Sequence, residues 1–475
     1  MLPHSTRRAA RAPVLASKGK LSVTHTIMQR ITSIILVASV VTSVALSAAG
    51  QVKVAPLDIK QRTMANGLHV VMLRDNASPT VAIHVLYNVG GKNDPIGKSG
   101  FAHMFEHMMF KSTRNMPSEK MDRLTEDVGG FNNASTHPDF TNYYEVVPSN
   151  YLETLLWAES DRMVNLNVDD ANFKSERDVV KEEFRQSVLA QPYGRFEEAV
   201  NNLAFQKHAY KRGVIGNLGE LDAATPQDAQ QFYKTYYRPD NAYLIVVGDF
   251  DQKQLDAWVD KYFGRIPKPA GSIPRATDAE PEWTTERRYN ETGPIVPFPA
   301  VAIDYLAPMP TDPDVPALMI AENILSGGES SRLYQELVRK QQIAQEASFD
   351  ADIRAERGLL TLLAIGSENG TPEKMEAALL AEVKKMQDAP VSALELEKAK
   401  NQLISRAIRR RENNDGKAIA IEQAIAYQSD PNAVNSEIQK LQAVTAGDIQ
   451  RVMKKYIKDN NRVVIYYTQG EKKDE

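Results

Sequence analysis

Hydrophobic positions along this chain show two periodicities, one typical of strands and one typical of helices. The same order of strand-like and helix-like segments occurs twice. Apolar runs at residues 68–73 and 81–87 follow a turn at residues 66–67, and they predict an early pair of strands. Long stretches with the helical spacing of apolar residues come next. Runs at 243–247 and 463–467 predict a final strand in each half. This content predicts an α+β fold in which helices cover one face of a mostly antiparallel sheet.

An internal repeat relates the two halves. The triplet Val-Ala-Ile at residues 81–83 returns at residues 301–303, an offset of 220 positions. The same offset carries seven residues near the end of the first half onto identical residues of the second: Thr225, Asp228, Gln230, Lys234, Tyr236, Asn241 and Ile245. One offset that holds at both ends of a half predicts two homologous domains.

Prolines separate the halves. Residues 267–299 contain seven prolines, and neither a helix nor a central strand is expected to persist there. We therefore expect a first domain at 51–266, a Pro-rich interdomain linker at 267–299 and a second repeat at 300–475.

The first 49 residues have the pattern of a targeting segment. Residues 31–49 are apolar or small, follow Arg30 and end in Ser-Ala-Ala, which predicts a secretory signal peptide cut after about Ala49. A retained membrane anchor is the alternative, because a stretch of this length could span a bilayer. Met28 stands directly before this segment and is a second possible start. With the signal removed, we expect a periplasmic or otherwise exported protein without a membrane anchor.

Charge and cysteine usage exclude several classes of function. The net charge is −4, and the six basic side chains of residues 1–49 leave 51 basic against 61 acidic residues in the remainder. Such an acidic body is a poor partner for nucleic acid or anionic lipid. The chain contains no cysteine, so a metal would have to be held by histidine and carboxylate.

The candidate chemistry lies in residues 100–110, which read GFAHMFEHMMF. On a helix, His103 and His107 stand one turn apart on the same face, so both imidazoles can reach a single ion. Glu106 projects beside that ion, where a carboxylate can take a proton from a metal-bound water. This is the inverted H-x-x-E-H arrangement of zinc peptidases.

A third ligand is expected on a second helix, at residues 173–188. A helical wheel places Val179, Val180, Phe184 and Val188 on the buried face, with Glu176 and Glu183 within the same arc and Glu182 pointing to solvent. A carboxylate on an apolar face is costly unless it is paired or bound to a metal. We therefore predict Glu183 as the metal ligand and Glu176 as a residue that orients one of the histidines. The alternative for these two glutamates is an ion pair with a neighbouring Arg or Lys.

These motifs resemble the pitrilysin/insulinase family of zinc peptidases, and its shorter bacterial branch related to the mitochondrial processing peptidase most of all. The similarity continues over roughly residues 55–470, in the runs GGFNNAST at 129–136, TNY at 141–143, YYRPDN at 236–241, VVGDF at 246–250 and SGGESSRLY at 326–334. The resemblance implies a zinc-dependent endopeptidase with one Zn²⁺ per chain. It assigns His103, His107 and Glu183 as ligands and Glu106 as the general base.

The resemblance also implies a dimer. Two homologous halves form one half of a clamshell chamber, so a chain of this length needs a second one to close it. At the 220 offset the site residues map onto Asn323, Ser326, Gly327 and Leu403, which cannot replace them. The second half is therefore expected to have a structural or substrate-binding role.

The second half also departs from the family at an Arg and a Tyr that usually reach the substrate. Val338 and Gln345 stand at those places, and a shift by one residue gives Arg339 with Glu346. We therefore predict a heterodimer in which a homologous, metal-less partner supplies the pair. A self-sufficient homodimeric peptidase and a non-catalytic scaffold, like the family's respiratory-complex core subunits, are the alternatives.

Peptide recognition is expected along the run at 131–136. If it lies at a sheet edge, its backbone can pair with an extended peptide, and Asn133 and Ala134 are the predicted contacts. An enclosed chamber would admit unfolded peptides and exclude folded proteins.

Overall fold

The computed structural model describes residues 52–470, of which residues 56–470 belong to one compact unit. The expected signal segment, residues 1–49, lies outside the described residues. Between residues 52 and 470, no helix has both the length and the apolar character that crossing a bilayer requires.

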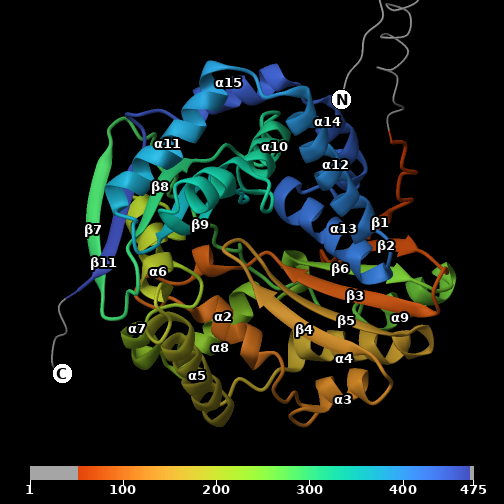
Figure 1. Cartoon of the computed structure of the whole chain (residues 1–475). Coiled ribbons are helices and arrows are strands. Elements are labelled where there is room, and N and C mark those ends of the chain that lie inside the picture. The colour runs from red at the N-terminus through yellow and green to blue at the C-terminus, as the bar shows by residue number, and fades with distance from the viewer. Residues whose placement is uncertain (1–51, 471–475) are drawn as a thin grey trace, which may run out of the picture. The chain divides into compact units, whose positions relative to one another are not determined.

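A six-stranded sheet organises the first half (Figure 1). Its strands, in spatial order, are β1 (Lys60–Thr63), β2 (His69–Arg74), β6 (Ala242–Gly248), β3 (Thr80–Tyr87), β5 (Thr141–Pro148) and β4 (Phe131–Thr136). Only β2 and β6 run parallel, and every other neighbouring pair is antiparallel. The expected mostly antiparallel sheet is therefore confirmed.

The second half repeats this order. Its sheet consists of β7 (Arg287–Gly293), β11 (Val463–Gln469), β8 (Ala300–Leu306), β10 (Leu359–Gly366) and β9 (Ala344–Asp352). Again one pair is parallel, β7 with β11, and the others are antiparallel. The repeated Val-Ala-Ile triplets lie in β3 and β8, which occupy equivalent central positions.

The helices follow the same repeat. In the first half they are α2 (Phe101–Met108), α3 (Lys120–Glu126), α4 (Leu152–Asn165), α5 (Asp170–Phe184), α6 (Gly194–Ala204), α7 (Leu218–Ala223), α8 (Pro226–Tyr236) and α9 (Gln252–Tyr262). In the second half they are α10 (Val315–Ser326), α11 (Pro372–Asp388), α12 (Ala393–Arg410), α13 (Asn414–Gln428), α14 (Glu437–Ala443) and α15 (Ala446–Tyr456).

Helix caps explain part of the repeated sequence. Thr225 and Asp228 form a capping box at the start of α8, and Thr445 and Asp448 form the same box at the start of α15. In each box the side chains bond each other's backbone N–H groups, which would otherwise lack partners at a helix N-terminus.

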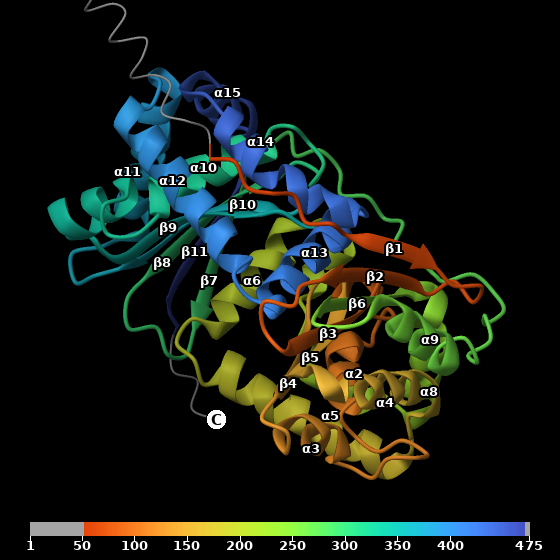
Figure 2. The same ribbon diagram turned by 90° about the vertical axis from the view of Figure 1, so that its right-hand side faces the viewer.

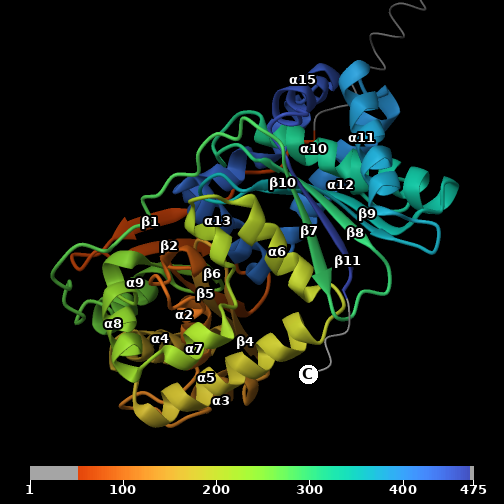
Figure 3. The same ribbon diagram turned by 90° about the vertical axis from the view of Figure 1, so that its left-hand side faces the viewer.

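The two halves exchange one helix each (Figure 2). Helix α13 of the second half packs Ala418, Ile421 and Ile425 against the face of the first sheet that carries Val71 and Ile245. Helix α6 of the first half makes the equivalent contact with the second sheet, through Phe196 and Ala204 against Ala300, Ala302, Val463 and Ile465 (Figure 3).

This exchange corrects the expectation that helices cover one face only. Strand side chains point alternately to both faces, and β3 and β6 are apolar on both, so each sheet needs a second cover. The expected linker at 267–299 contains the edge strand β7, where a proline-rich neighbourhood is tolerated. The sequence repeat and the two sheets thus divide the chain in the same way. Helices α6 and α13, however, each pack on the sheet of the other half.

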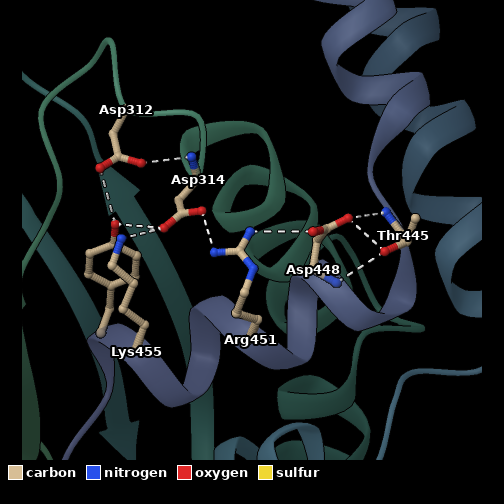
Figure 4. Close-up of polar contacts among 7 residues, drawn as sticks. Asp312, Asp314, Thr445, Asp448, Arg451 and Lys455 are labelled. Carbon is tan, nitrogen blue, oxygen red and sulfur yellow. Dashed lines mark hydrogen bonds and ion pairs between the residues drawn. The ribbon is translucent and has the colours of Figure 1, made fainter.

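In each half, a buried aspartate at the equivalent position holds the start of a helix, α2 in the first half and α10 in the second. In the second half the Asp314 carboxylate accepts from Arg451 and Lys455, both at 2.6 Å, and so ties the start of α10 to α15 (Figure 4). In the first half Asp94, which lies 220 positions earlier, accepts from the backbone N–H of Gly100 at 2.6 Å and of Ala102 at 2.8 Å. Asp94 therefore fixes the first turn of α2 through backbone N–H groups.

Candidate metal centre

Helix α2 presents the inverted motif on its less buried face. Phe101, Ala102, Met104, Phe105 and Met108 are buried in the core, which leaves the motif residues on the opposite side. The rings of His103 and His107 stand nearly perpendicular, with centroids 4.9 Å apart. Gly100 precedes the helix with φ 88°, and a Cβ there would lie 2.7 Å from the Ile215 carbonyl, so this entry into α2 requires glycine.

Helix α5 packs against α2 (Figure 1), and its Glu183 reaches both histidines. Glu183 Oε2 lies 3.6 Å from His103 Nε2 and 3.4 Å from His107 Nε2. One ligand atom from each of the three side chains lies within 4.8 Å of the other two, and among the described residues no other group of three or more metal-binding side chains does so. The structure thus brings together the three residues that the sequence singled out.

The helical wheel placed Glu176 correctly on the buried face of α5, but Glu183 is only half-buried and one valine is exposed. Glu182 is exposed and contacts Arg185 at 3.2 Å. Val179, expected on the buried face, is 46% exposed. The buried residues of α5 are Phe173, Glu176, Val180 and Phe184, a stripe at helical spacing that is too narrow to include Val179.

Glu176 forms an ion pair with a lysine, which was the alternative to its expected role of orienting a histidine. Its Oε1 is 2.7 Å from Lys111 Nζ and accepts from the Ser175 hydroxyl at 2.8 Å. Its Oε2 faces His107 Nδ1 at 3.9 Å, which is beyond hydrogen-bond distance. The buried Glu176 carboxylate is therefore stabilised by an ion pair, and its expected role of orienting His107 stays a prediction.

The charges of the three converging groups depend on one another. Burial lowers the pKa of His103 to about 4, so this imidazole is neutral at pH 7. Burial also opposes a charge on His107, but Glu183 outweighs it and raises the pKa of His107. A hydrogen bond from His107 lowers the pKa of Glu183, which is therefore ionised. Zinc takes carboxylate oxygens and deprotonated imidazole nitrogens as ligands, so a proton on His107 would have to leave before that nitrogen could bind the ion.

Glu106 lies beside this cluster and contacts strand β4. Its Oε2 accepts a hydrogen bond of 2.6 Å from the Thr136 hydroxyl. Burial raises the pKa of Glu106, and the Thr136 hydroxyl and backbone N–H oppose that shift. A partly buried carboxylate with a raised pKa, next to a possible metal site, has the properties of a general base.

Strand β4 lies at the edge of its sheet, as the peptide-binding prediction requires. Asn133 and Ser135 are opposite Tyr144 and Asn142 of β5. The Ala134 N–H faces away from β5, because it donates to the Asn133 side chain at 2.8 Å. The alternation of strand groups therefore makes Asn132, Ala134 and Thr136 the residues whose backbone groups face outward at this edge.

None of the equivalent positions of the second half carries a histidine or a glutamate. Ser326, at the position of Glu106, bonds the backbone of Phe349, and Asn323, at the position of His103, is buried. Gln345, at the place of the family's Tyr, donates to the Gly366 carbonyl at 3.0 Å.

Two contacts of the site were missed from the sequence. Thr136 lies in a run that predicts peptide pairing, and that pattern gives no indication that its hydroxyl reaches Glu106. Lys111 lies beyond the end of α2, so the helical spacing of the motif gave no signal for its contact with Glu176.

The comparisons with known proteins agree with this geometry. The chain matches the family model described as Insulinase (Peptidase family M16) over residues 69–217, and the model described as Peptidase M16 inactive domain over residues 223–403. It is 29% identical over 407 residues to the zinc protease PqqE of Helicobacter pylori, covering 85% of this chain and 91% of that one. It is 24% identical over 408 residues to a probable mitochondrial-processing peptidase subunit beta of Arabidopsis thaliana, covering 84% and 76%.

A solved structure extends the similarity to three dimensions. The crystal structure of a protease from Helicobacter pylori matches with a TM-score of 0.83 at 28% identity, over 86% of this chain and 99% of that one. Two adjoining family models and a shared fold over most of the described residues leave one conclusion. The chain belongs to the pitrilysin/insulinase (M16) family of peptidases.

Proposed function

We propose that this protein is a zinc-dependent endopeptidase that hydrolyses unfolded peptides. The observation that carries the proposal is the convergence of His103, His107 and Glu183 on one point, with Glu106 beside them. Zinc protease relatives support the choice of metal.

The donor atoms fit a zinc ion. Two bonds of about 2.0–2.1 Å at a tetrahedral angle place their ligand atoms about 3.3 Å apart. The distances from Glu183 Oε2 to the two Nε2 atoms, 3.6 and 3.4 Å, are close to that value. His103, His107 and Glu183 would therefore hold one Zn²⁺ and leave a coordination position for the reaction.

Zinc, when bound there, supplies a Lewis acid that polarises the peptide carbonyl and lowers the pKa of a water to about 7. Glu106 accepts a proton from the attacking water and returns it to the leaving amine. Burial suits Glu106 to this role, because its raised pKa brings it closer to that of the group it deprotonates.

The substrate binds as an additional strand beside β4. The outward N–H and C=O groups of Ala134 pair with the peptide backbone, once the Asn133 side chain releases the Ala134 N–H. Main-chain pairing selects an extended conformation, so folded proteins are excluded and many unfolded sequences are accepted.

A second chain completes the chamber. The protein is the metal-bearing subunit, and a homologous partner without the metal motif supplies the Arg and Tyr that the second half lacks. A mitochondrial-processing peptidase subunit among the relatives supports this assembly. The leader-like residues 31–49 support an exported, periplasmic location for the mature protein.

Chelation tests the enzyme and the partner together. We expect a chelator to abolish cleavage of an unfolded peptide and one equivalent of Zn²⁺ to restore it, with a folded protein resistant throughout. Full activity of the purified chain by itself would contradict the heterodimer. Absence of both zinc and activity, with any homologous partner added, would favour the non-catalytic scaffold.

A further inference from the structure

The free edge of β4 ends at Thr136, which contacts the proposed general base, Glu106. Ala134 and Thr136 both direct backbone groups away from β5. The Ala134 N–H is held by the Asn133 side chain, and the Thr136 hydroxyl donates to Glu106 Oε2 at 2.6 Å. The last residue of the peptide-binding strand therefore contacts the group that would move the proton.

A related contact between helix and edge strand occurs in the second half. Ser326, which takes the place of Glu106 at the 220 offset, accepts from the Phe349 N–H at 2.5 Å and donates to the Phe349 carbonyl at 2.9 Å. Phe349 lies in β9, the edge strand equivalent to β4. The end of α2 or α10 is thus bonded to the edge strand in both halves.

The two contacts differ in what they leave free. In the second half the serine hydroxyl occupies both outward groups of Phe349, so that stretch of the edge is closed. In the first half the Thr136 hydroxyl donates to a carboxylate oxygen, Glu106 Oε2, and bonds no backbone group of the edge strand in that contact. The contact therefore holds the proposed base and does not close the edge.

From this geometry we propose that Thr136 is a positioning residue, which fixes the rotamer of Glu106 and couples peptide pairing on β4 to the base. The inference rests on the proposed peptidase function. A carboxylate without this donor can rotate about its last side-chain bonds, and a misplaced base loses rate rather than substrate affinity.

Three substitutions separate positioning from structure. Thr136→Val keeps the shape and removes the hydroxyl, whereas Thr136→Ser restores it. Thr141→Val is the matched control, because Thr141 is directly opposite Thr136 in β5 and its hydroxyl donates to the Val89 carbonyl instead. Wild type and Glu106→Gln are measured alongside, each with zinc content and unfolding midpoint.

We expect Thr136→Val to lower kcat about tenfold or more, with KM within about twofold and zinc content unchanged. Thr136→Ser should recover most of that loss, and Thr141→Val should lower the unfolding midpoint without the same fall in kcat. Wild-type kcat in Thr136→Val would overturn the inference while the proposed function stands. Wild-type activity in Glu106→Gln would instead overturn the proposed function.

Hydrogen exchange gives a second readout that needs no turnover. The backbone N–H of residue 136 faces the Glu106 carboxylate. If the hydroxyl fixes that carboxylate, this amide should exchange faster in Thr136→Val, after correction for intrinsic rates, and at the wild-type rate in Thr136→Ser. Equal exchange in all three proteins would contradict the proposal even if the chain by itself is inactive.

Discussion

His84 Nδ1 lies 2.8 Å from Glu422 Oε2, in a contact that joins strand β3 of the first half to helix α13 of the second. His84 Nε2 lies 3.2 Å from Asp415, and Asn142 donates to the other oxygen of Glu422 at 2.7 Å. The imidazole is fully buried, and burial opposes its charge, but the two carboxylates outweigh burial and raise its pKa to about 9. The exchanged helix is therefore held by a buried, charged histidine.

This pair predicts that stability falls at alkaline pH. The pKa of His84 is about 9 in the folded chain and near 6.5 when unfolded. Its stabilising contribution is thus complete below pH 6.5 and disappears as the pH rises through 9, with a total of about 3 kcal/mol.

Unfolding midpoints between pH 6 and pH 10 measure this contribution. His84→Gln should be less stable than wild type at pH 6 and should lose less stability between pH 6.5 and pH 9.5. If both proteins lose the same amount over that range, the charged pair is not the cause.

The neighbouring glutamates of α5 give the sharpest test of the ligand set. Glu183→Gln should lower zinc affinity at least tenfold, because it replaces an ionised oxygen donor that faces both histidines. Glu182→Gln should leave affinity unchanged, since Glu182 is exposed and contacts Arg185 and Gln186 at the surface. Competition with a chromophoric chelator measures both, and equal losses would refute the assignment.

Glu106→Gln should separate binding from catalysis. The amide keeps the shape of the side chain but cannot accept the proton, so we expect zinc stoichiometry to be retained and peptide hydrolysis to fall about 10²-fold or more. Metal analysis and a peptide assay on the same sample provide the comparison. Loss of zinc together with activity would indicate that Glu106 acts as a ligand.

The exchanged helix should stabilise both halves at once. Ile421 is fully buried between α13 and the first sheet, so Ile421→Ala should cost about 2–5 kcal/mol. Leu394→Ala, at a side chain that is 77% exposed, should change stability by less than about 0.5 kcal/mol. Since the exchange links the halves, we expect one cooperative transition by circular dichroism, and a separate transition for each half would contradict this.

Local pattern predicted much of the fold and of the site. The 220 offset relates β3 to β8, and it relates the Thr-Asp cap of α8 to that of α15. A strand and a helix cap each depend on residues close together in sequence, so the sequence pattern could predict them. The spacing of His103 and His107 and the wheel position of Glu183 were sufficient to nominate three side chains that the structure brings together.

Contacts between distant segments were not predictable in the same way. The periodicity of α13 identifies a helix but does not say which sheet it covers, so the exchange of α6 and α13 could not be foreseen. Lys111 as the partner of Glu176 and Thr136 as the donor to Glu106 depend on how α2, α5 and β4 pack. Val179 was wrongly expected to be buried, because a helical wheel gives the direction of a side chain but not the width of the buried face.

The central claim is that His103, His107 and Glu183 hold one zinc ion. Anomalous diffraction at the zinc edge, from crystals grown with one equivalent of Zn²⁺, tests it most directly. We predict a single strong peak per chain bounded by His103 Nε2, His107 Nε2 and a Glu183 oxygen. No peak at that point in a zinc-loaded crystal, or a peak held by other residues, would contradict the account.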